Sequence, residues 1–319
     1  SQNPLCITSN SLKHSFISHI MSVAEIQVEA DLETFDDKDP WYSVAIDLIK
    51  RKPLGAAGAL IVLIMIIMAL MAELIAPFDP ELNSYEYMLV GPNWTFLFGT
   101  DQFGRDIFSR IVFGARTALF VGFVSAIIGS SLGLVLGVTS AYFGGRFDLI
   151  FQRIMDIFMS FPLIILALAV VSIFGTGTQN VILAITIPFI PRCARVVRSN
   201  ALAVREVPYI DAARACGFSH TRIILRHMVP NVMAPYLIMF TAFVGQAILL
   251  EASLSYLGLG VQEPVAAWGL MLQGGAEEFA ESAPWIPIFP GVAISLAVFG
   301  FNLFGDAIRD VLDPKLRSR

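Results

Sequence analysis

The chain has 319 residues, of which 56% are hydrophobic, whereas soluble domains contain roughly 45 to 50% apolar residues. With a mean hydropathy of +0.70, this composition excludes an ordinary soluble enzyme and predicts an integral membrane protein. The formal net charge of -5 at pH 7 argues against a nucleic-acid partner. Cys6, Cys193 and Cys216 are widely separated, so neither a disulfide framework nor a thiolate metal site is expected.

The first 52 residues come before any long apolar stretch, and we expect them to form an amino-terminal region of three parts. Residues 1–20 show no strong periodicity and are interpreted as an extension that takes no part in the fold. Residues 25–39 carry seven acidic side chains against one Lys, which predicts a solvated cytoplasmic tail. Residues 41–52 place Trp41 and further apolar side chains on one side, which predicts an amphipathic helix at the inner membrane interface.

Long apolar stretches follow, and a helix that rises about 1.5 Å per residue needs such lengths to cross a hydrocarbon core about 30 Å thick. These stretches are Leu54–Ile75, Thr117–Phe143, Leu149–Phe174, Asn180–Val197, Pro235–Leu257 and Pro287–Ile308. We therefore predict an all-α transmembrane domain over residues 53–314 with about six spans, followed by a short tail over residues 315–319. Pro162, Pro188 and Pro191 lie inside or beside spans and predict kinks.

The distribution of Lys and Arg predicts the orientation of these spans. If the amino terminus is inside, residues 77–116 and 258–286 lie outside and hold only Arg105, Arg110 and Arg116 of the 21 basic residues. This asymmetry follows the positive-inside rule. We therefore expect a multi-pass membrane protein with both termini in the cytoplasm.

A polar, basic stretch over residues 205–231 interrupts the apolar spans. Its arginines are Arg205, Arg214, Arg222 and Arg226. These side chains are costly in hydrocarbon, so the loop should face the cytoplasm. Its pattern predicts one short helix from Tyr209 to Cys216, which Gly217 closes in a left-handed conformation, and a second that Ser219 caps and that runs to Pro230. Such a unit would form a rigid knob on the inner face.

A second polar stretch, residues 99–119 with the sequence GTDQFGRDIFSRIVFGARTAL, comes before the second span. Gly99 and Gly104 break the chain, while the residues after them give one apolar, helix-like side. The charged residues that are spaced to pair locally are Asp101, Arg105, Asp106 and Arg110. We predict an interfacial helix that is pinned by these charges, which either fix the fold alone or also contact a partner or substrate.

Both polar stretches resemble those of a known family. Asp211-Ala212-Ala213, Gly217 and the later Val229-Pro230 resemble the EAA loop of ABC-importer permeases, in which Glu and Leu are usual where this chain has Asp211 and Val229. The pattern GTDxxGRDxxSRxxxGAR, together with residues 226–231 and 251–258, resembles the dipeptide, oligopeptide and nickel branch, as its C-type permease. The resemblance extends over roughly residues 40–314.

This resemblance implies a type I ABC importer permease fold, in which the loop over residues 205–231 contains the coupling helix that sits in a cleft of an ATPase subunit. The residues it assigns to coupling are Asp211, Ala212, Ala213, Gly217, Phe218, Ser219 and Pro230. The implied partners are two cytoplasmic ATPase subunits, a second related permease subunit and an extracytoplasmic substrate-binding protein, with membrane lipid around the spans.

No phosphate-binding loop of the form G-x-x-x-x-G-K-[ST] occurs, and no Lys lies between Lys52 and Lys315. We therefore expect ATP and its magnesium ion to be bound by the partner ATPase subunits. In this chain we expect no catalytic residue, no cofactor and no metal site.

The function that follows is that of a permease subunit, which forms half of a pathway for short peptides received from the binding protein. Nickel chelates or oligosaccharides carried by the same architecture stay open, because selectivity often lies in the binding protein. A stand-alone secondary transporter or channel would need its own coupling-ion or filter residues, and about six spans with few intramembrane charges fit this poorly.

The second span also contains Gly129, Gly133 and Gly137, a small-residue row on one helix face. The segment from Gly129 to Gly133 matches the G-x-S-x-G pattern of a hydrolase nucleophile, with Ser131 at its centre. All four His residues lie outside the expected spans, so we interpret the glycines as a helix-packing row.

Ionisable groups inside a span are functional candidates, because a charge is costly there. Glu251 lies in the fifth expected span near Ser253, and we name both as pathway candidates. For Glu251, lining the pathway and bonding to the partner subunit both stay open. Arg153 and Asp156 lie near the inner end of the third span and are expected to pair with each other.

Overall fold

The computed structural model describes residues 52–276 and 278–312. The expected extension, the acidic tail and all of the interfacial helix except Lys52 lie outside the described residues, as does the tail over residues 315–319.

The described residues form helices joined by loops, without a β-strand among them. The long helices are α3 (Pro53–Leu70), α5 (Ile107–Phe143), α8 (Thr178–Arg205), α11 (Met233–Tyr256) and α13 (Trp285–Leu312). The shorter ones are α4 (Ala72–Ile75), α6 (Gly145–Met159), α7 (Leu163–Phe174), α9 (Pro208–Ala215), α10 (His220–Ile223) and α12 (Trp268–Ala276). Single helical turns are η1 (Tyr85–Tyr87), η2 (Ile224–Met228) and η3 (Val229–Val232). The predicted all-α fold class is confirmed.

The structure contains five helices that are long and apolar enough to cross a membrane, among the residues it describes, and a bent pair that makes a sixth. The bent pair is α6 and α7, which meet at 88°. Pro162 explains the break, because proline disfavours a helical conformation in the residue before it. The bend expected at Pro162 is therefore confirmed, but it turns the third span into two helices rather than one kinked helix.

Helix α5 packs against α8 through the glycine row. A Cβ atom on Gly133 would lie 2.5 Å from the Cβ atom of Cys193, and one on Gly129 would lie 2.8 Å from that of Phe189. At Gly137 the added atom would meet a backbone oxygen of α8 at 2.6 Å. The three glycines let the two helix backbones approach closely, which confirms the interpretation of the row as a packing surface.

Ser131, the centre of the hydrolase-like pattern, lies on another side of α5. Its Oγ atom is 3.2 Å from the hydroxyl oxygen of Tyr236 on α11. The group that pairs with this hydroxyl is thus a second hydroxyl and not a histidine base. Helix-to-helix contact accounts for the whole pattern.

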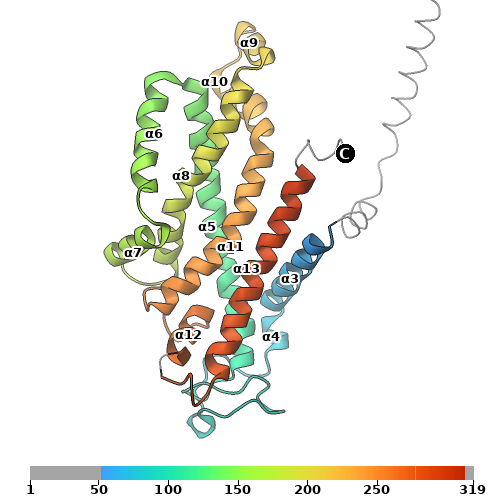
Figure 1. Ribbon diagram of the computed structural model, residues 1–319, viewed down its shortest axis with the longest axis vertical. Coiled ribbons are helices and arrows are strands. Elements are labelled where there is room, and N and C mark those ends of the chain that lie inside the picture. The colour runs from blue at the N-terminus through green and yellow to red at the C-terminus, as the bar shows by residue number, and fades with distance from the viewer. Residues whose placement is uncertain (1–51, 277, 313–319) are drawn as a thin grey trace, which may run out of the picture. The chain divides into compact units, whose positions relative to one another are not determined.

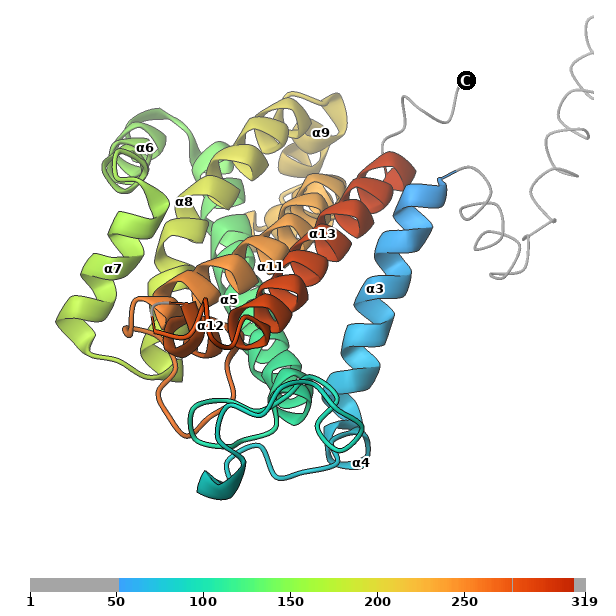
Figure 2. The same ribbon diagram turned by 60° about the horizontal axis from the view of Figure 1, so that its bottom comes forward.

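Helices α3 and α13 run side by side (Figure 2). A Cβ atom on Gly58 would lie 2.6 Å from the Cβ atom of Leu303, so the glycine is needed for this approach. Lys52, just before α3, pairs with Asp310 near the end of α13 at 2.6 Å. The start of α3 and the end of α13 therefore lie at the same end of the bundle.

Figure 1 shows at which end of the helix bundle each polar segment lies. Helices α9 and α10 lie at one end of the bundle, which we call the loop end, and the last turn of α13 points the same way. Helices α4 and α12 and the segment before α5 lie at the opposite end. The two polar stretches of the sequence are therefore separated by the length of α5.

The glycine row yields a stability prediction. Gly133→Ala should destabilise the protein by about 1–3 kcal/mol, because the new methyl group overpacks against Cys193. The matched control is Gly291→Ala in α13, where the nearest atom is 3.9 Å from the added carbon. Gly291→Ala should be neutral or stabilising by up to about 1 kcal/mol. Thermal unfolding in detergent measures both, and equal melting temperatures would contradict the packing described for α5 and α8.

Candidate functional site

The loop over residues 205–231 folds as two helical arms around a left-handed turn. Gly217 has φ +74°, its N–H donates to the carbonyl of Arg214 at 2.9 Å, and the N–H of Phe218 donates to the carbonyl of Ala213 at 3.2 Å. These bonds form the glycine-centred cap that ends many helices. Ser219 starts the second arm, where its side chain accepts a hydrogen bond from the backbone of Arg222. The predicted turn and cap are confirmed.

The second arm differs from the regular helix that the sequence predicts. Only α10 is α-helical, and it continues as the wide turn η2 and the tight turn η3. Pro230 explains part of this difference, because proline has no N–H to donate within a helix. The arm nevertheless leads without a break into α11, so the loop is coupled mechanically to that long helix.

Polar bonds and apolar packing hold the two arms together. The hydroxyl of Tyr209 donates to the carbonyl of His227 at 3.1 Å, and Asn231 donates to the same carbonyl at 2.7 Å. The rings of Phe218 and His227 stack with centroids 6.0 Å apart. Side chains fully or almost fully buried between the arms are Ile210, Ala213, Ile223 and Met228. The loop is therefore a small folded unit rather than a flexible connection.

The seven coupling residues named from the sequence divide into two groups in this unit. Ala213 is buried and Phe218 is half-buried, so these two hold the arms together. The exposed ones are Asp211, Ala212, Gly217, Ser219 and Pro230. The exposed group lies on the surface of the loop, where a second protein has access. Their contact with an ATPase stays a prediction.

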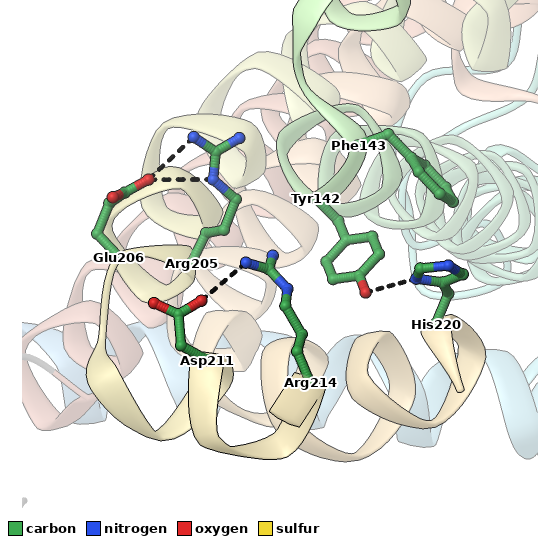
Figure 3. Close-up of a pocket in the computed structure, with 7 residues that line it drawn as sticks. All are labelled: Tyr142, Phe143, Arg205, Glu206, Asp211, Arg214 and His220. Atoms are coloured by element: carbon green, nitrogen blue, oxygen red, sulfur yellow. Dashed lines mark hydrogen bonds and ion pairs between the residues drawn. The ribbon is translucent and has the colours of Figure 1, made fainter. Parts of the chain in front are cut away.

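A cleft of about 500 Å³ lies between this loop and the end of α5 (Figure 3). Its lining residues are Tyr142, Phe143, Arg205, Glu206, Asp211, Arg214 and His220. Arg214 donates to Asp211 at 2.9 Å, and Arg205 forms an ion pair with Glu206 at 2.9 Å. The charges in the cleft are thus paired within the chain, and the cleft is not a site that selects for one sign of charge.

Two contacts across this cleft tie the loop to the end of α5. The hydroxyl oxygen of Tyr142 is 2.7 Å from Nδ1 of His220, the first residue of α10. Arg205, the last residue of α8, donates to the carbonyl of Ala141 at 2.8 Å. A displacement of the loop would therefore act on α5 as well as on α8 and α11. The sequence analysis missed Tyr142 and His220, which have no local signal because 78 positions separate them.

At the opposite end of the bundle, Asp101 organises a buried ionic cluster. Its carboxylate accepts hydrogen bonds from the backbone N–H groups of Phe103 at 2.8 Å and Arg105 at 2.9 Å, and from Nε of Arg105 at 2.7 Å. The Arg105 guanidinium also donates two hydrogen bonds to Glu263, at 2.6 and 3.2 Å. Burial disfavours the cation, but the hydrogen bond to Glu263 and the charge of Asp101 outweigh it, so the pKa of Arg105 lies above its ordinary value.

The other two charged residues of this stretch do not pair with each other. Asp106 caps α5, where its Oδ2 atom accepts from the N–H of Ser109 at 2.8 Å. Arg110 instead donates to the carbonyl of Pro80 at 2.9 Å and lies 3.6 Å from Glu263. The predicted interfacial helix that leads into the second span is the first part of α5, because Ile107 begins a helix that continues without a break through the span. The capping carboxylate fixes that starting point.

A turn and a distant residue complete the cluster. Gly104 has φ +71°, and a Cβ atom there would clash with the backbone of Ser84, so only glycine fits this approach. Glu263 lies 158 positions after Arg105, in the segment between α11 and α12. The sequence analysis did not name Glu263, because nothing local to it indicates an arginine partner. The cluster pins that segment to the start of α5.

The two pathway candidates in α11 face different surroundings. Glu251 is 1% exposed, and its carboxylate accepts a hydrogen bond from the hydroxyl of Ser255 at 2.7 Å. The same hydroxyl accepts from the N–H of Val261 at 3.1 Å, so Glu251 braces the turn that follows α11. Ser253 instead lines an open, mostly apolar groove of about 350 Å³. Their roles in transport stay predictions.

No group of three or more His, Cys, Asp or Glu side chains that could hold a metal ion occurs in the described part of the chain.

A bundle of membrane-crossing helices with one folded basic loop at a single end defines a multi-pass membrane protein. Its fold matches that of a solved structure, an inward-facing conformation of the MetNI methionine ABC transporter. The TM-score is 0.52 at 22% sequence identity, and the match covers 65% of this chain and 98% of that chain. The fold is therefore that of an ABC importer permease.

The chain belongs to the family of binding-protein-dependent transport system inner membrane components, whose model matches residues 129–318. The model of the N-terminal TM domain of oligopeptide transport permease C matches residues 40–92. The chain is 43% identical to the dipeptide transport system permease protein DppC of Alkalihalophilus pseudofirmus, over 88% of this chain and 91% of that protein. It is 42% identical to the glutathione transport system permease protein GsiD of Pectobacterium atrosepticum, over 84% of this chain and 89% of that protein.

The ionic cluster yields a second stability prediction. Asp101→Asn should cost about 3 kcal/mol or more, because an amide N–H₂ group would face Nε of the buried Arg105. The control is Glu73→Gln, which removes an exposed ion pair with Arg116 at 3.4 Å and should cost less than about 1 kcal/mol. Denaturant unfolding of both variants measures the difference. If the two substitutions had similar effects, the cluster would not hold the segment in place.

Proposed function

We propose that this chain forms half of the translocation pathway of an ATP-driven importer for short peptides. Family membership supports the importer role. The relatives named dipeptide and glutathione permeases support the substrate class, since both of those solutes are short peptides. A substrate-binding protein outside the membrane would deliver the peptide, and a second, related permease subunit would complete the pathway.

The observation that carries the proposal is the folded loop over residues 205–231. It presents Asp211 and Ser219 on its surface and is tied to α5 through Tyr142 and His220. In the proposed complex an ATPase subunit holds this surface. When ATP binding closes the ATPase pair, the loop moves together with the cleft of the ATPase subunit that holds it. Helices α5, α8 and α11 then move with the loop, because they are connected to it.

The chain itself supplies no ATP chemistry in this proposal. Two partner subunits bind ATP and magnesium, because the sequence has no phosphate-binding loop. Hydrolysis there resets the pathway to the state that opens inward. The permease contributes mechanical coupling and the pathway surface, and it has no catalytic residue of its own.

The proposed orientation places the loop end in the cytoplasm. Two features support it: the excess of arginine in the loop, and the contact between Lys52 and Asp310, which brings both ends of the transmembrane domain together. The cluster around Asp101 would then face the outside, where the binding protein docks.

Charge reversal in the loop tests the proposal. Asp211→Arg should abolish the stimulation of ATPase activity by peptide-loaded binding protein and reduce uptake at least about tenfold, because a like charge next to Arg214 disrupts the proposed ATPase-facing surface. Asp306→Arg makes the same change at an exposed carboxylate of α13 outside the loop and should leave both activities near the wild-type level. The measurement uses the whole complex in lipid vesicles.

An Asp211→Arg complex with normal uptake and normal ATPase stimulation would contradict the coupling role. A wild-type complex that hydrolyses ATP but takes up no peptide would instead contradict the substrate class and leave the coupling role in place.

A further inference from the structure

Helix α8 carries three arginines at three-residue spacing, and two of them contact α6. Arg198 donates from Nε to Asp148 of α6 at 2.6 Å, and Arg195 pairs with Asp156 of the same helix. Arg192 continues the row, because residues three positions apart are neighbours on a helix surface. Arg153, which was expected to pair with Asp156, lies 4.0 Å from it and is a weaker partner than Arg195. The two helices therefore share a charged face.

Arg192 lies in the membrane-crossing part of the chain. The expected span over Asn180–Val197 contains it, and α8 continues beyond that span to Arg205. At about 1.5 Å per residue, the 28 residues of α8 are longer than a hydrocarbon core about 30 Å thick, so the end of α8 extends beyond the core while Arg192 lies inside the apolar stretch.

Arg192 differs from the other two arginines because it has no partner within the described part of the chain. It forms no ion pair and donates no hydrogen bond to residues 52–276 or 278–312, and it is partly exposed. A guanidinium that faces lipid inside the hydrocarbon core is disfavoured. This cost favours water or protein over lipid around Arg192.

The face also carries a surplus of positive charge. Its charged side chains are Asp148, Arg153, Asp156, Arg192, Arg195 and Arg198, four cations against two anions. Such a surplus in a low-dielectric setting attracts an anion. The planar guanidinium offers paired N–H donors that match the geometry of a carboxylate.

We propose that the charged face between α6 and α8 lines the water-filled translocation pathway and that Arg192 binds the carboxylate of the solute as it passes. This inference rests on the proposed function, because every short peptide with a free carboxyl end presents this group. Asp148 and Asp156 hold the neighbouring arginines in place, and Arg192 remains open to the solute.

Thiol labelling of the complete complex in lipid tests whether Arg192 faces water. Cys6 and Cys216 are replaced by Ser and Cys193 by Ala, and either Arg192→Cys or Leu183→Cys is then introduced. Leu183 is an exposed apolar position about two and a half turns before Arg192, on the opposite side of the same helix. A negatively charged, water-soluble thiosulfonate reagent should label Arg192→Cys and leave Leu183→Cys unlabelled, because the reaction needs a hydrated thiolate. Peptide-loaded binding protein with ATP should slow the labelling of Arg192→Cys.

Uptake measurements test whether the charge of Arg192 is used. Arg192→Gln should lower peptide uptake about tenfold or more, the usual effect of one lost charge-assisted hydrogen bond, while Arg192→Lys should retain more of it. ATPase stimulation by the loaded binding protein should persist in both variants, because neither change touches the loop.

Three results would overturn the inference. One is an Arg192→Cys thiol as unreactive as that of Leu183→Cys, and another is wild-type uptake by Arg192→Gln. The third is loss of the second permease subunit from purified Arg192→Gln complex, which would show that the arginine bonds to that subunit instead. A failure of the wild-type complex to take up peptide would be separate, since it would count against the proposed function.

Discussion

The close approach of α5 and α8 through three glycines is the contact on which the rest of the structure depends. Inside a membrane, helices gain little from hydrophobic burial against each other, so close van der Waals packing must hold them together. The row of Gly129, Gly133 and Gly137 provides that packing along about two turns of α5. Because α8 leads into the basic loop and α5 reaches both ends of the bundle, this contact positions every other feature.

Helix α5 connects the two polar sites as a single rod. It has 37 residues and is therefore about 55 Å long at the usual rise per residue. Its first turn is held by Asp106 and by the cluster around Asp101 and Arg105, and its last turn holds Tyr142 against His220. A movement imposed on the loop is thus carried along one continuous helix to the opposite end, which is the property that a coupled permease requires.

Local signals in the sequence were enough to predict the main elements, whereas contacts between distant residues were not. The apolar stretches predicted the long helices, and Gly217 and Ser219 predicted the turn and the cap of the loop, because each acts on its immediate neighbours. Glu263, Tyr142 and His220 had no such signal, since their partners lie far away along the chain. These contacts exist only once the helices are packed.

Two further differences between the expected and the observed helices concern the size of a bend and the length of a helix. Pro162 predicted a bend, but its size depends on how α6 and α7 pack on α8, which the local sequence does not specify. The extent of α8 was underestimated because its second half carries arginines, which lower the hydropathy used to place the end of a span. Arg195 and Arg198 pair with Asp156 and Asp148 of α6, and this charged face appears only when both helices are placed.

The coupling role of the loop is tested most directly through Cys216, an exposed thiol next to Gly217. In the complete complex, with Cys6 and Cys193 replaced, this thiol is labelled with a short photoactivated cross-linker. A product that joins this chain to an ATPase subunit is predicted, because the loop is the surface that the ATPase should hold. A labelled Cys216 that cross-links to no ATPase subunit, in a complex that still transports, would contradict the coupling role.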